Sequence, residues 1–218
     1  MPAKTKPKKG TKTATRRKQP VQARSQRRFE AIVEAAAESF ARFGFDATTM
    51  EGIAARAETS IGSVYQFFPN KTSVFREVAQ RALQTVEATF VAAMGPDPTT
   101  RAWPDLLERS IDVFFDMHRH SVAMQAIVRN LHLYREYEEQ DRAQLETFRE
   151  RTSALLAIWV PDLPPKKRKA VGATLVNTVA STMLVLSREP AASATMLKNE
   201  AKVMLRRYLS AYVPEPEP

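Results

Sequence analysis

The chain lacks cysteine entirely and has only six glycines among its 218 residues. Without thiols it has no disulfide, thiolate nucleophile, iron–sulfur cluster or cysteine-based zinc site. The three histidines, His118, His120 and His132, have spacings that do not suit metal binding, so neither a metal nor a cofactor is expected. A phosphate-cradling glycine loop and a Gly-x-Ser-x-Gly sequence are also missing, which weighs against an enzyme.

Long hydrophobic runs are scarce as well. No apolar stretch approaches the roughly 20 residues that cross a bilayer, and the N-terminus is too basic and too proline-broken for a secretion signal. We therefore expect a soluble cytoplasmic protein with no membrane association. Hydrophobic residues make up 44% of the chain, which is enough to bury a substantial core.

Acidic residues are absent from residues 1–22, which hold eight of the basic side chains. Since the net charge is +9, the remainder of the chain carries about +1 (9 − 8). A basic segment rich in proline and threonine, with few large apolar residues, buries too little surface to offset its ordering entropy. Residues 1–22 are therefore predicted to form a disordered arm. Its natural partner is a polyanion, and a solubilising tail is the alternative.

Apolar residues recur every three or four positions along the chain, and no segment alternates with a period of two. This pattern predicts an all-α fold of about nine helices. A capping-box pattern, Thr48-Thr49-Met50-Glu51, is expected to begin the second helix, and Asn70 to cap the fourth. The other expected helices span about 24–43, 60–68, 102–118, 120–131, 134–160, 164–188 and 193–212.

The stretch SIGSVYQFFPNK follows a short helix and a polar turn, as the second helix of a helix-turn-helix does. On a 3.6-residue period Val64 and Phe68 share one face, which suits the core. Gly62 permits close approach of a DNA backbone, and Phe67 is expected outside the core because it adjoins Phe68. Side chains suited to phosphates or base edges are those of Ser63, Tyr65, Gln66, Phe67 and Lys71.

Residues 48–75, TTMEGIAARAETSIGSVYQFFPNKTSVF, and the preceding AAAESFARFGF closely resemble the DNA-binding domain of the tetracycline-repressor-like (TetR) family of bacterial transcriptional regulators. The resemblance covers about residues 26–75. It rests on a joint pattern of Phe40, Gly44, Thr49, Ile53-Ala54, Ala57, Gly62, Tyr65, Phe68 and Lys71. It implies phosphate contacts by Thr49, Ser63, Tyr65 and Lys71, and proximity to the bases for Ile61, Gly62, Gln66 and Phe67.

The predicted DNA-contacting set is Thr49, Ser60, Ile61, Gly62, Ser63, Tyr65, Gln66, Phe67 and Lys71, together with Arg24, Arg27 and Arg28, which join the arm to the first helix. Two alternatives are open, because Ile61 also suits the core edge and Tyr65 also suits a half-buried helix position. The family commonly has Gly and Val in the turn, where this chain has Glu58 and Thr59. A left-handed conformation at Glu58 costs on the order of 1 kcal/mol.

The resemblance implies a three-helix DNA-binding domain over residues 23–71 and a helical ligand-sensing and dimerisation domain over 72–213. The final PEPEP sequence predicts a frayed acidic tail at 214–218. A pocket for a small apolar or aromatic ligand is predicted among Phe114, Met117, His118, Met124, Ile127, Phe148, Leu155 and Trp159, with plain core as the alternative. Dimer contacts are predicted at Ala173, Val176, Asn177, Ala180 and Leu184, with an internal monomer core as the alternative.

The leading interpretation is a homodimeric TetR-like regulator, most simply a repressor, that binds a palindromic operator in double-stranded DNA. A ligand in the C-terminal domain changes the spacing of the two DNA-binding domains and releases the DNA. One alternative is a largely sequence-indifferent DNA-coating protein driven by the basic arm. The other is a helical enzyme.

Overall fold

The computed structural model describes residues 18–133 and 138–214, and within these ranges every regular element is helical. The predicted all-α fold is confirmed. Residues 1–17 of the predicted arm and residues 215–218 of the predicted tail lie outside the described residues, as do residues 134–137. The helices are α1 (Lys18–Phe43), α2 (Met50–Arg56), α3 (Ile61–Phe67), α4 (Lys71–Met94), the short 3₁₀ helix η1 (Pro98–Thr100), α5 (Trp103–His120), α6 (Val122–Arg129), α7 (Glu138–Trp159), α8 (Pro165–Leu186) and α9 (Ala191–Ser210).

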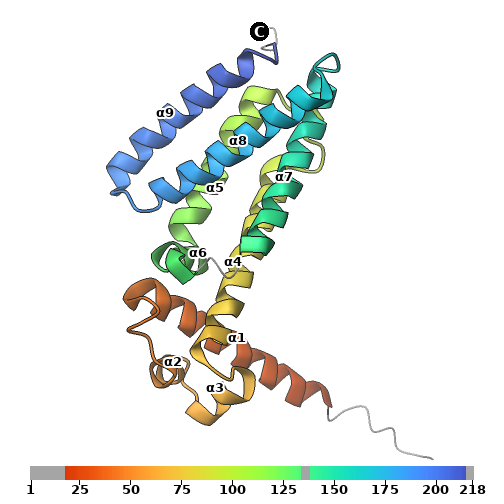
Figure 1. Ribbon diagram of the computed structural model, residues 1–218. Helices are drawn as coiled ribbons and strands as arrows, with labels where there is room; N and C mark the ends of the chain where they lie inside the picture. The colour runs from red at the N-terminus through yellow and green to blue at the C-terminus, as the bar shows by residue number, and fades with distance from the viewer. Residues whose placement is uncertain (1–17, 134–137, 215–218) are drawn as a thin grey trace, which may run out of the picture.

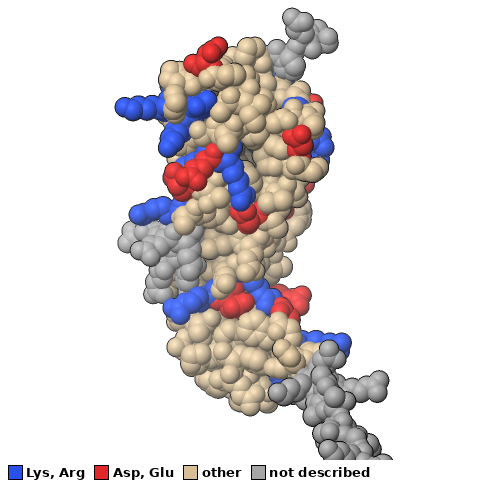
Figure 2. All heavy atoms as spheres, turned by 90° about the vertical axis from the view of Figure 1, so that its right-hand side faces the viewer, with Lys and Arg blue, Asp and Glu red and all other residues tan. Residues whose placement is uncertain are grey.

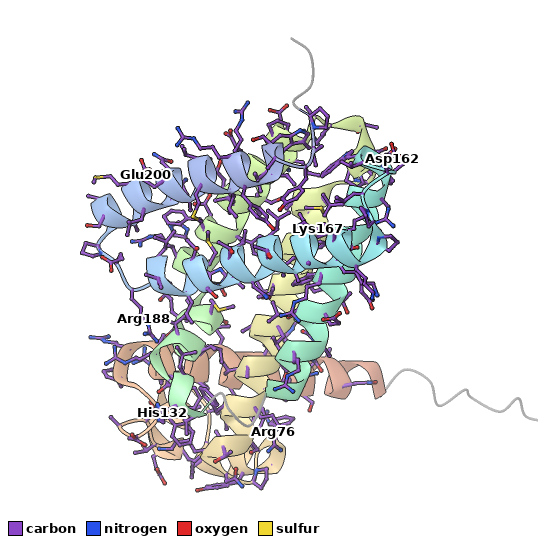
Figure 3. The ribbon with its side chains drawn as sticks, turned by 45° about the horizontal axis from the view of Figure 1, so that its top comes forward. Arg76, His132, Asp162, Lys167, Arg188 and Glu200 are labelled. Carbon is purple, nitrogen blue, oxygen red and sulfur yellow. The ribbon has the colours of Figure 1, made fainter. Side chains whose placement is uncertain are left out.

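The molecule is elongated, with α1, α2 and α3 gathered at one end and α8 and α9 side by side toward the other (Figure 1). The long helix α4 starts beside α3 and runs into the second group of helices, where it packs against α5 and α7. We call α1–α3 with the first turns of α4 the reading domain, and α5–α9 with the rest of α4 the C-terminal domain. Figure 3 shows Arg76 at the reading end and Lys167 and Glu200 on α8 and α9 at the opposite end.

The described part of helix α1 starts at Lys18, so residues 18–22, which were predicted to belong to the disordered arm, are helical. Pro20 lies in the first turn of the helix. A proline is tolerated there because its missing N–H has no intrahelical partner in any case. Pro214, assigned to the frayed tail, is also fixed, because its carbonyl accepts a 2.8 Å hydrogen bond from Trp103 Nε1.

Two apolar cores hold the fold together. The first lies in the reading domain around Ile32, Phe40, Val64 and Phe75, and it continues into Ile127 and its neighbours on α6. The second joins α5, α7, α8 and α9 through Trp103, Ile111, Leu156, Met183 and Leu205. Because α6 shares the first core, a helix of the C-terminal domain is packed directly into the reading domain.

The ends of α4 explain why the long helix has these bounds. Asn70 is the N-cap, as predicted, and its Oδ1 accepts from the backbone N–H of Ser73 at 2.8 Å. The Ser73 hydroxyl lies 3.3 Å from the backbone nitrogen of Asn70 and completes a capping box. At the other end Gly95 has φ of 75°, a left-handed conformation that glycine adopts without steric cost.

Helix α8 is long and largely apolar. By length and composition it is the one helix among the described residues that is long and apolar enough to cross a membrane. The expectation that no stretch approached this limit was therefore wrong, because the uncharged Thr174, Asn177 and Ser181 interrupt the apolar pattern only weakly. In the structure α8 packs against α5, α7 and α9.

Candidate nucleic-acid interface and ligand cavity

Helix α3 is held by one face, as the periodicity predicts. Val64 is fully buried and Phe68, just after the helix, is 5% exposed. The Phe68 ring stacks on Phe29 of α1 with centroids 5.3 Å apart. Ser60 caps the helix by accepting from the backbone N–H of Ser63 at 3.2 Å. These contacts fix the orientation of α3 on the reading domain.

The opposite face of α3 is open. Ile61 is 36% exposed and Tyr65 50% exposed, and Gly62 and Gln66 are exposed beside them. Of the two alternatives for Ile61 and Tyr65, the structure favours accessible surface positions. A Cβ added to Gly62 would meet nothing within 4 Å. Packing within the chain therefore gives no reason for a glycine here, although glycine costs a helix about 1 kcal/mol relative to alanine.

Phe67 does not belong to this open face. Its ring makes an edge contact with Phe29 at 5.6 Å between centroids, and it packs on the core of the reading domain as a partly buried residue. The expectation that Phe67 lies outside the core beside Phe68 was wrong. Because Phe29 projects from α1 across the end of α3, it contacts both rings at once.

Lys71 is occupied within the chain. Its Nζ donates to the carbonyl oxygens of Phe45 at 2.6 Å, Thr48 at 2.8 Å and Asp46 at 3.4 Å. The ammonium also lies 4.3 Å from the centroid of the Phe45 ring. An ammonium group has three donors, and all three are directed at the loop between α1 and α2. The structure thus assigns Lys71 to bracing that loop, in place of the predicted phosphate contact.

The start of α2 differs from the predicted capping box by one residue. The N-cap is Thr49, whose Oγ1 accepts from the backbone N–H of Gly52 at 3.0 Å. Thr48 is buried and donates to the carbonyl of Gly44, so it is not available as a cap. Glycine at the N3 position has no side chain to reach back, which rules out a capping box here. Thr49 remains exposed, and its hydroxyl hydrogen is still available to a phosphate.

The remaining predicted contact residues surround α3. Ser60 is exposed and Ser63 half-buried, with their hydroxyl oxygens 2.9 Å apart. Arg24, Arg27 and Arg28 are exposed along the first turns of α1. Helix α3 itself, Ile61–Phe67, contains no charged residue. Figure 2 likewise shows mainly uncharged side chains over the visible face of the reading domain, below a belt of charged ones.

The turn between α2 and α3 has a left-handed conformation at Glu58, which is costly for a residue other than glycine. Glu58 has φ of 50° and is the only non-glycine with a positive φ among the described residues. The backbone N–H of Thr59 bonds to the carbonyl of Ala54 and that of Glu58 to the carbonyl of Ala55. These two bonds form a Schellman motif, which usually has glycine at the position of Glu58.

Replacing Glu58 with glycine is expected to raise the free energy of unfolding by about 0.5–1 kcal/mol. The left-handed conformation costs an L-residue about 1–2 kcal/mol, and the greater flexibility of unfolded glycine offsets part of the gain. Urea denaturation followed by far-UV circular dichroism measures the change. Glu58→Ala is the matched control, because it removes the same charge and keeps the strained conformation. An equal gain in both variants would attribute the effect to charge at the end of α2.

The C-terminal domain encloses a cavity of about 410 Å³, within the usual range for small-molecule sites. Seven of the eight predicted pocket residues line it: Phe114, His118, Met124, Ile127, Phe148, Leu155 and Trp159. The eighth, Met117, instead packs in the core shared by α1, α4 and α6. Phe148 stacks on Phe90 of α4 with centroids 4.4 Å apart, so one wall of the cavity is aromatic.

The stripe predicted for dimer contacts turns partly inward. Val176, Ala180 and Leu184 line the cavity and are half-buried. Asn177 is exposed, and its Oδ1 accepts from Arg149 Nη2 at 2.6 Å. Ala173 is half-buried. The most exposed large apolar side chains of α8 and α9 are instead Val185, Met196, Leu197, Val203 and Met204.

His118 is the titratable group that lines the cavity. Its Nδ1 lies 2.9 Å from the carbonyl oxygen of Phe114. Because a carbonyl oxygen only accepts, Nδ1 carries the hydrogen and Nε2 is an acceptor in the neutral ring. Burial lowers the pKa of His118 from its ordinary value of 6.5, and the Phe114 carbonyl opposes this in part. The ring is therefore neutral at neutral pH.

Helix α6 connects the cavity with the reading domain. It contributes Met124, Ile127 and Val128 to the cavity wall. Just beyond its end, the buried Asn130 accepts from the backbone N–H of Phe45 at 2.7 Å and donates to the carbonyl of Phe40 at 3.2 Å. From the other side, Arg188 after α8 donates to the carbonyl of Val128 at 3.2 Å, and Figure 3 shows Arg188 beside α6.

Two protein-family models match this architecture. Residues 32–78 match the model for bacterial regulatory proteins of the tetR family, and residues 102–209 match that for the tetracyclin repressor-like C-terminal domain. The first match covers most of the reading domain, and the second extends from the start of α5 almost to the end of α9. The chain belongs to the TetR family of transcriptional regulators. As a member of this family it is a helix-turn-helix DNA-binding regulator and not an enzyme.

Individual relatives of this TetR-family regulator support the same family assignment. YhgD of Bacillus subtilis (strain 168), described as an uncharacterised HTH-type transcriptional regulator, is 40% identical over 65 residues, which are 30% of this chain and 34% of YhgD. That match thus spans about a third of the relative's length. A TetR-family transcriptional regulator from Streptomyces coelicolor has the same fold, with 24% identity and a TM-score of 0.60 over 86% of this chain and 98% of that one.

A second solved neighbour of the TetR-family regulator is NalD, the secondary repressor of the MexAB-OprM multidrug efflux pump in Pseudomonas aeruginosa. It is 20% identical, with a TM-score of 0.59 over 88% of this chain and 98% of NalD.

Two residues that matter in the fold of the present regulator were not identified from sequence. Asn130 and Arg188 hold α6 through backbone carbonyls far away in the chain, and no local pattern identifies such contacts.

Proposed function

We propose that this regulator is a cytoplasmic homodimeric repressor that binds a palindromic operator through α3 and leaves it when a small molecule fills the C-terminal cavity. The observation that carries the proposal is the exposed, uncharged face of α3. Gly62, Tyr65 and Gln66 lie there together, on a helix that Val64 anchors from behind. Close backbone approach, a phosphate-binding hydroxyl and a base-reading amide are the elements of a major-groove contact.

The exposed apolar side chains of α8 and α9 support a dimer. Met196 is 69% exposed, Val185 55% and Met204 51%, although side chains of this kind are usually buried. We propose that this surface contacts its twofold mate. A twofold dimer presents two copies of α3 in opposite orientations, and such an arrangement matches inverted half-sites in DNA.

The contacts of helix α6 support the proposal that a ligand releases the DNA. A molecule that fills the cavity contacts Met124 and Ile127, and the same helix is tied to the reading domain through Asn130. A shift of α6 is therefore transmitted to the end of α1 and the following loop. Release requires only that the ligand bind one arrangement of the dimer more tightly than the other. The naming of NalD as a repressor of an efflux pump supports a repressor by analogy of fold.

Substitutions on α3 test the DNA contacts. Tyr65→Ala is expected to weaken binding to operator and random DNA alike, because a phosphate contact carries no sequence information. Gln66→Ala is expected to relax the preference at one base pair of each half-site by about 1–3 kcal/mol. Electrophoretic mobility titrations against the operator and its single-base variants measure both effects. Tyr65→Phe is the matched control for the loss of the hydroxyl alone.

The operator itself is obtained by selecting bound genomic fragments and footprinting them. A single strong footprint with inverted half-sites supports the regulator, whereas equal displacement by random DNA would favour the sequence-indifferent coating protein. Folded, dimeric Tyr65→Ala protein with undiminished affinity would remove Tyr65 from the interface. Unchanged base preference in Gln66→Ala would do the same for Gln66.

A further inference from the structure

The lining of the C-terminal cavity limits the chemistry of its ligand. Among the described residues that line it there is no aspartate, glutamate, lysine or arginine. A buried ionised ligand needs a partner charge or several hydrogen bonds, because transfer of an ion out of water is costly. The wall offers no partner charge to a carboxylate or an ammonium ion. An uncharged ligand with a largely apolar body fits the aromatic and aliphatic lining.

The polar groups of the wall are few, and four of their donors are already engaged. They belong to Ser110, His118, Gln144, Thr152 and Ser181, and to the indole N–H groups of Trp103 and Trp159, of which Trp103 Nε1 donates to the carbonyl of Pro214. The Ser110 hydroxyl donates to the carbonyl of Leu106 at 2.7 Å, and Gln144 Nε2 donates to the carbonyl of Leu83 at 2.8 Å. The Nδ1 hydrogen of His118 is directed at Phe114. Backbone carbonyls thus engage these four donors, and the wall retains acceptors, Nε2 of His118 among them, for a ligand.

Nε2 of His118 is the best-defined of these acceptors. The Nδ1 contact fixes the ring and its tautomer, and Nε2 has no hydrogen-bond partner within the described part of the chain. A polar atom enclosed without a partner loses the hydrogen bond that it makes with water in the unfolded chain. A ligand that donates a hydrogen bond to this nitrogen replaces the hydrogen bond that was lost.

We propose that the cavity binds an uncharged, predominantly apolar molecule with one hydroxyl or N–H group, and that this group donates a hydrogen bond to Nε2 of His118. The proposal rests on the ligand-responsive function above and specifies the class of ligand. An apolar body supplies affinity through burial, and the single donor sets its orientation against α5. A ligand held in this way lies against Phe114, also on α5, and the α6 residues of the wall.

Three probes of similar size test the proposal by isothermal titration calorimetry with the full chain and no DNA. They are para-phenylphenol, which has a donor; para-fluorobiphenyl, which has none; and biphenyl-4-carboxylate, which is charged. We expect the phenol to bind about threefold to tenfold more tightly than the fluoro compound, the range for one net hydrogen bond. The carboxylate is expected to bind most weakly. Tightest binding by the carboxylate, equal binding of phenol and fluoro compound, or no binding by any probe would overturn the proposal.

Variants of His118 identify the acceptor. His118→Leu is expected to abolish the preference for the phenol, and His118→Gln, which keeps an acceptor, to retain part of it. His120→Leu is the matched control, because His120 has the same contact to a carbonyl four residues earlier but is exposed and does not line the cavity. Circular dichroism checks that each variant is folded. An undiminished phenol preference in folded His118→Leu would contradict the proposal.

The result of the ligand titration can be distinguished from the result of a test of the proposed function. The titration contains no DNA, so its result does not depend on whether an operator exists. Phenol binding with the expected His118 dependence, accompanied by unchanged operator affinity, would leave this inference standing and reject release by a ligand. Operator release by the carboxylate in preference to the phenol would reject the ligand class and leave release intact.

Discussion

Replacing Lys71 with methionine is expected to lower the free energy of unfolding of the reading domain by about 3 kcal/mol. The variant keeps the apolar stem and removes an ammonium that lies 2.6 Å from the carbonyl of Phe45 and 2.8 Å from that of Thr48. Hydrogen bonds to charged groups contribute about 1.5–3 kcal/mol each, and the two carbonyls lose their partner in a part-buried site. The loop between α1 and α2 is thus expected to loosen.

The measurement must report on the reading domain itself. Both tryptophans, Trp103 and Trp159, lie in the C-terminal domain, so their fluorescence does not follow the loss of α1–α3. Differential scanning calorimetry combined with far-UV circular dichroism detects an early transition of the smaller domain. Arg76→Met is the control, because Arg76 is an exposed cation on the same helix, where substitutions usually change stability by under about 0.5 kcal/mol.

The same variant distinguishes a loop brace from a phosphate contact. If Lys71 bound a phosphate, Lys71→Met would leave stability unchanged and reduce the salt dependence of DNA binding by about one unit of slope. If it braces the loop, stability falls, and DNA binding recovers when temperature is lowered enough to keep the domain folded. Wild-type stability in Lys71→Met would therefore refute the assignment made from the three carbonyl contacts.

The sequence was informative wherever a local period or a cap decides the structure. The anchoring of α3 by Val64, the N-cap at Asn70 and the left-handed turn at Glu58 all depend on residues close in the chain. The cavity was predicted nearly as well, because apolar residues at helical spacing on α5, α6 and α7 must face inward together. Periodicity gives the direction of a side chain around its own helix, and for these positions that is sufficient.

The sequence-based predictions were wrong where the direction of a side chain around its own helix does not determine its contacts. Phe67 points away from Val64, yet Phe29 reaches it from α1, and only the crossing of the two helices reveals this. Lys71 reaches back to a loop more than twenty residues earlier. On α8 the small and apolar residues occur on several faces, so periodicity did not distinguish the cavity face of Val176 and Ala180 from the exposed face of Val185.

Deletion of residues 2–17 is expected to reduce the salt dependence of DNA binding by several units in a plot of log K against log salt concentration. The segment carries seven basic side chains, Lys4, Lys6, Lys8, Lys9, Lys12, Arg16 and Arg17. Each phosphate neutralised adds about 0.9 to the slope. The deletion leaves the described helix α1, Lys18–Phe43, in place. Operator and random DNA are expected to lose affinity to a similar extent.

The arm is expected to contribute this much to the salt dependence because the exposed face of α3 has so little charge of its own. Helix α3 has no charged residue, and the ammonium of Lys71 is engaged with the loop. Arg24, Arg27 and Arg28 are the predicted cationic contacts that remain exposed in the described reading domain. A full-length variant with the seven basic residues changed to glutamine separates charge from length, and we expect it to behave like the deletion. An unchanged slope in both would identify the segment as a solubilising tail, and the reading domain would then have to bind DNA with few ionic contacts.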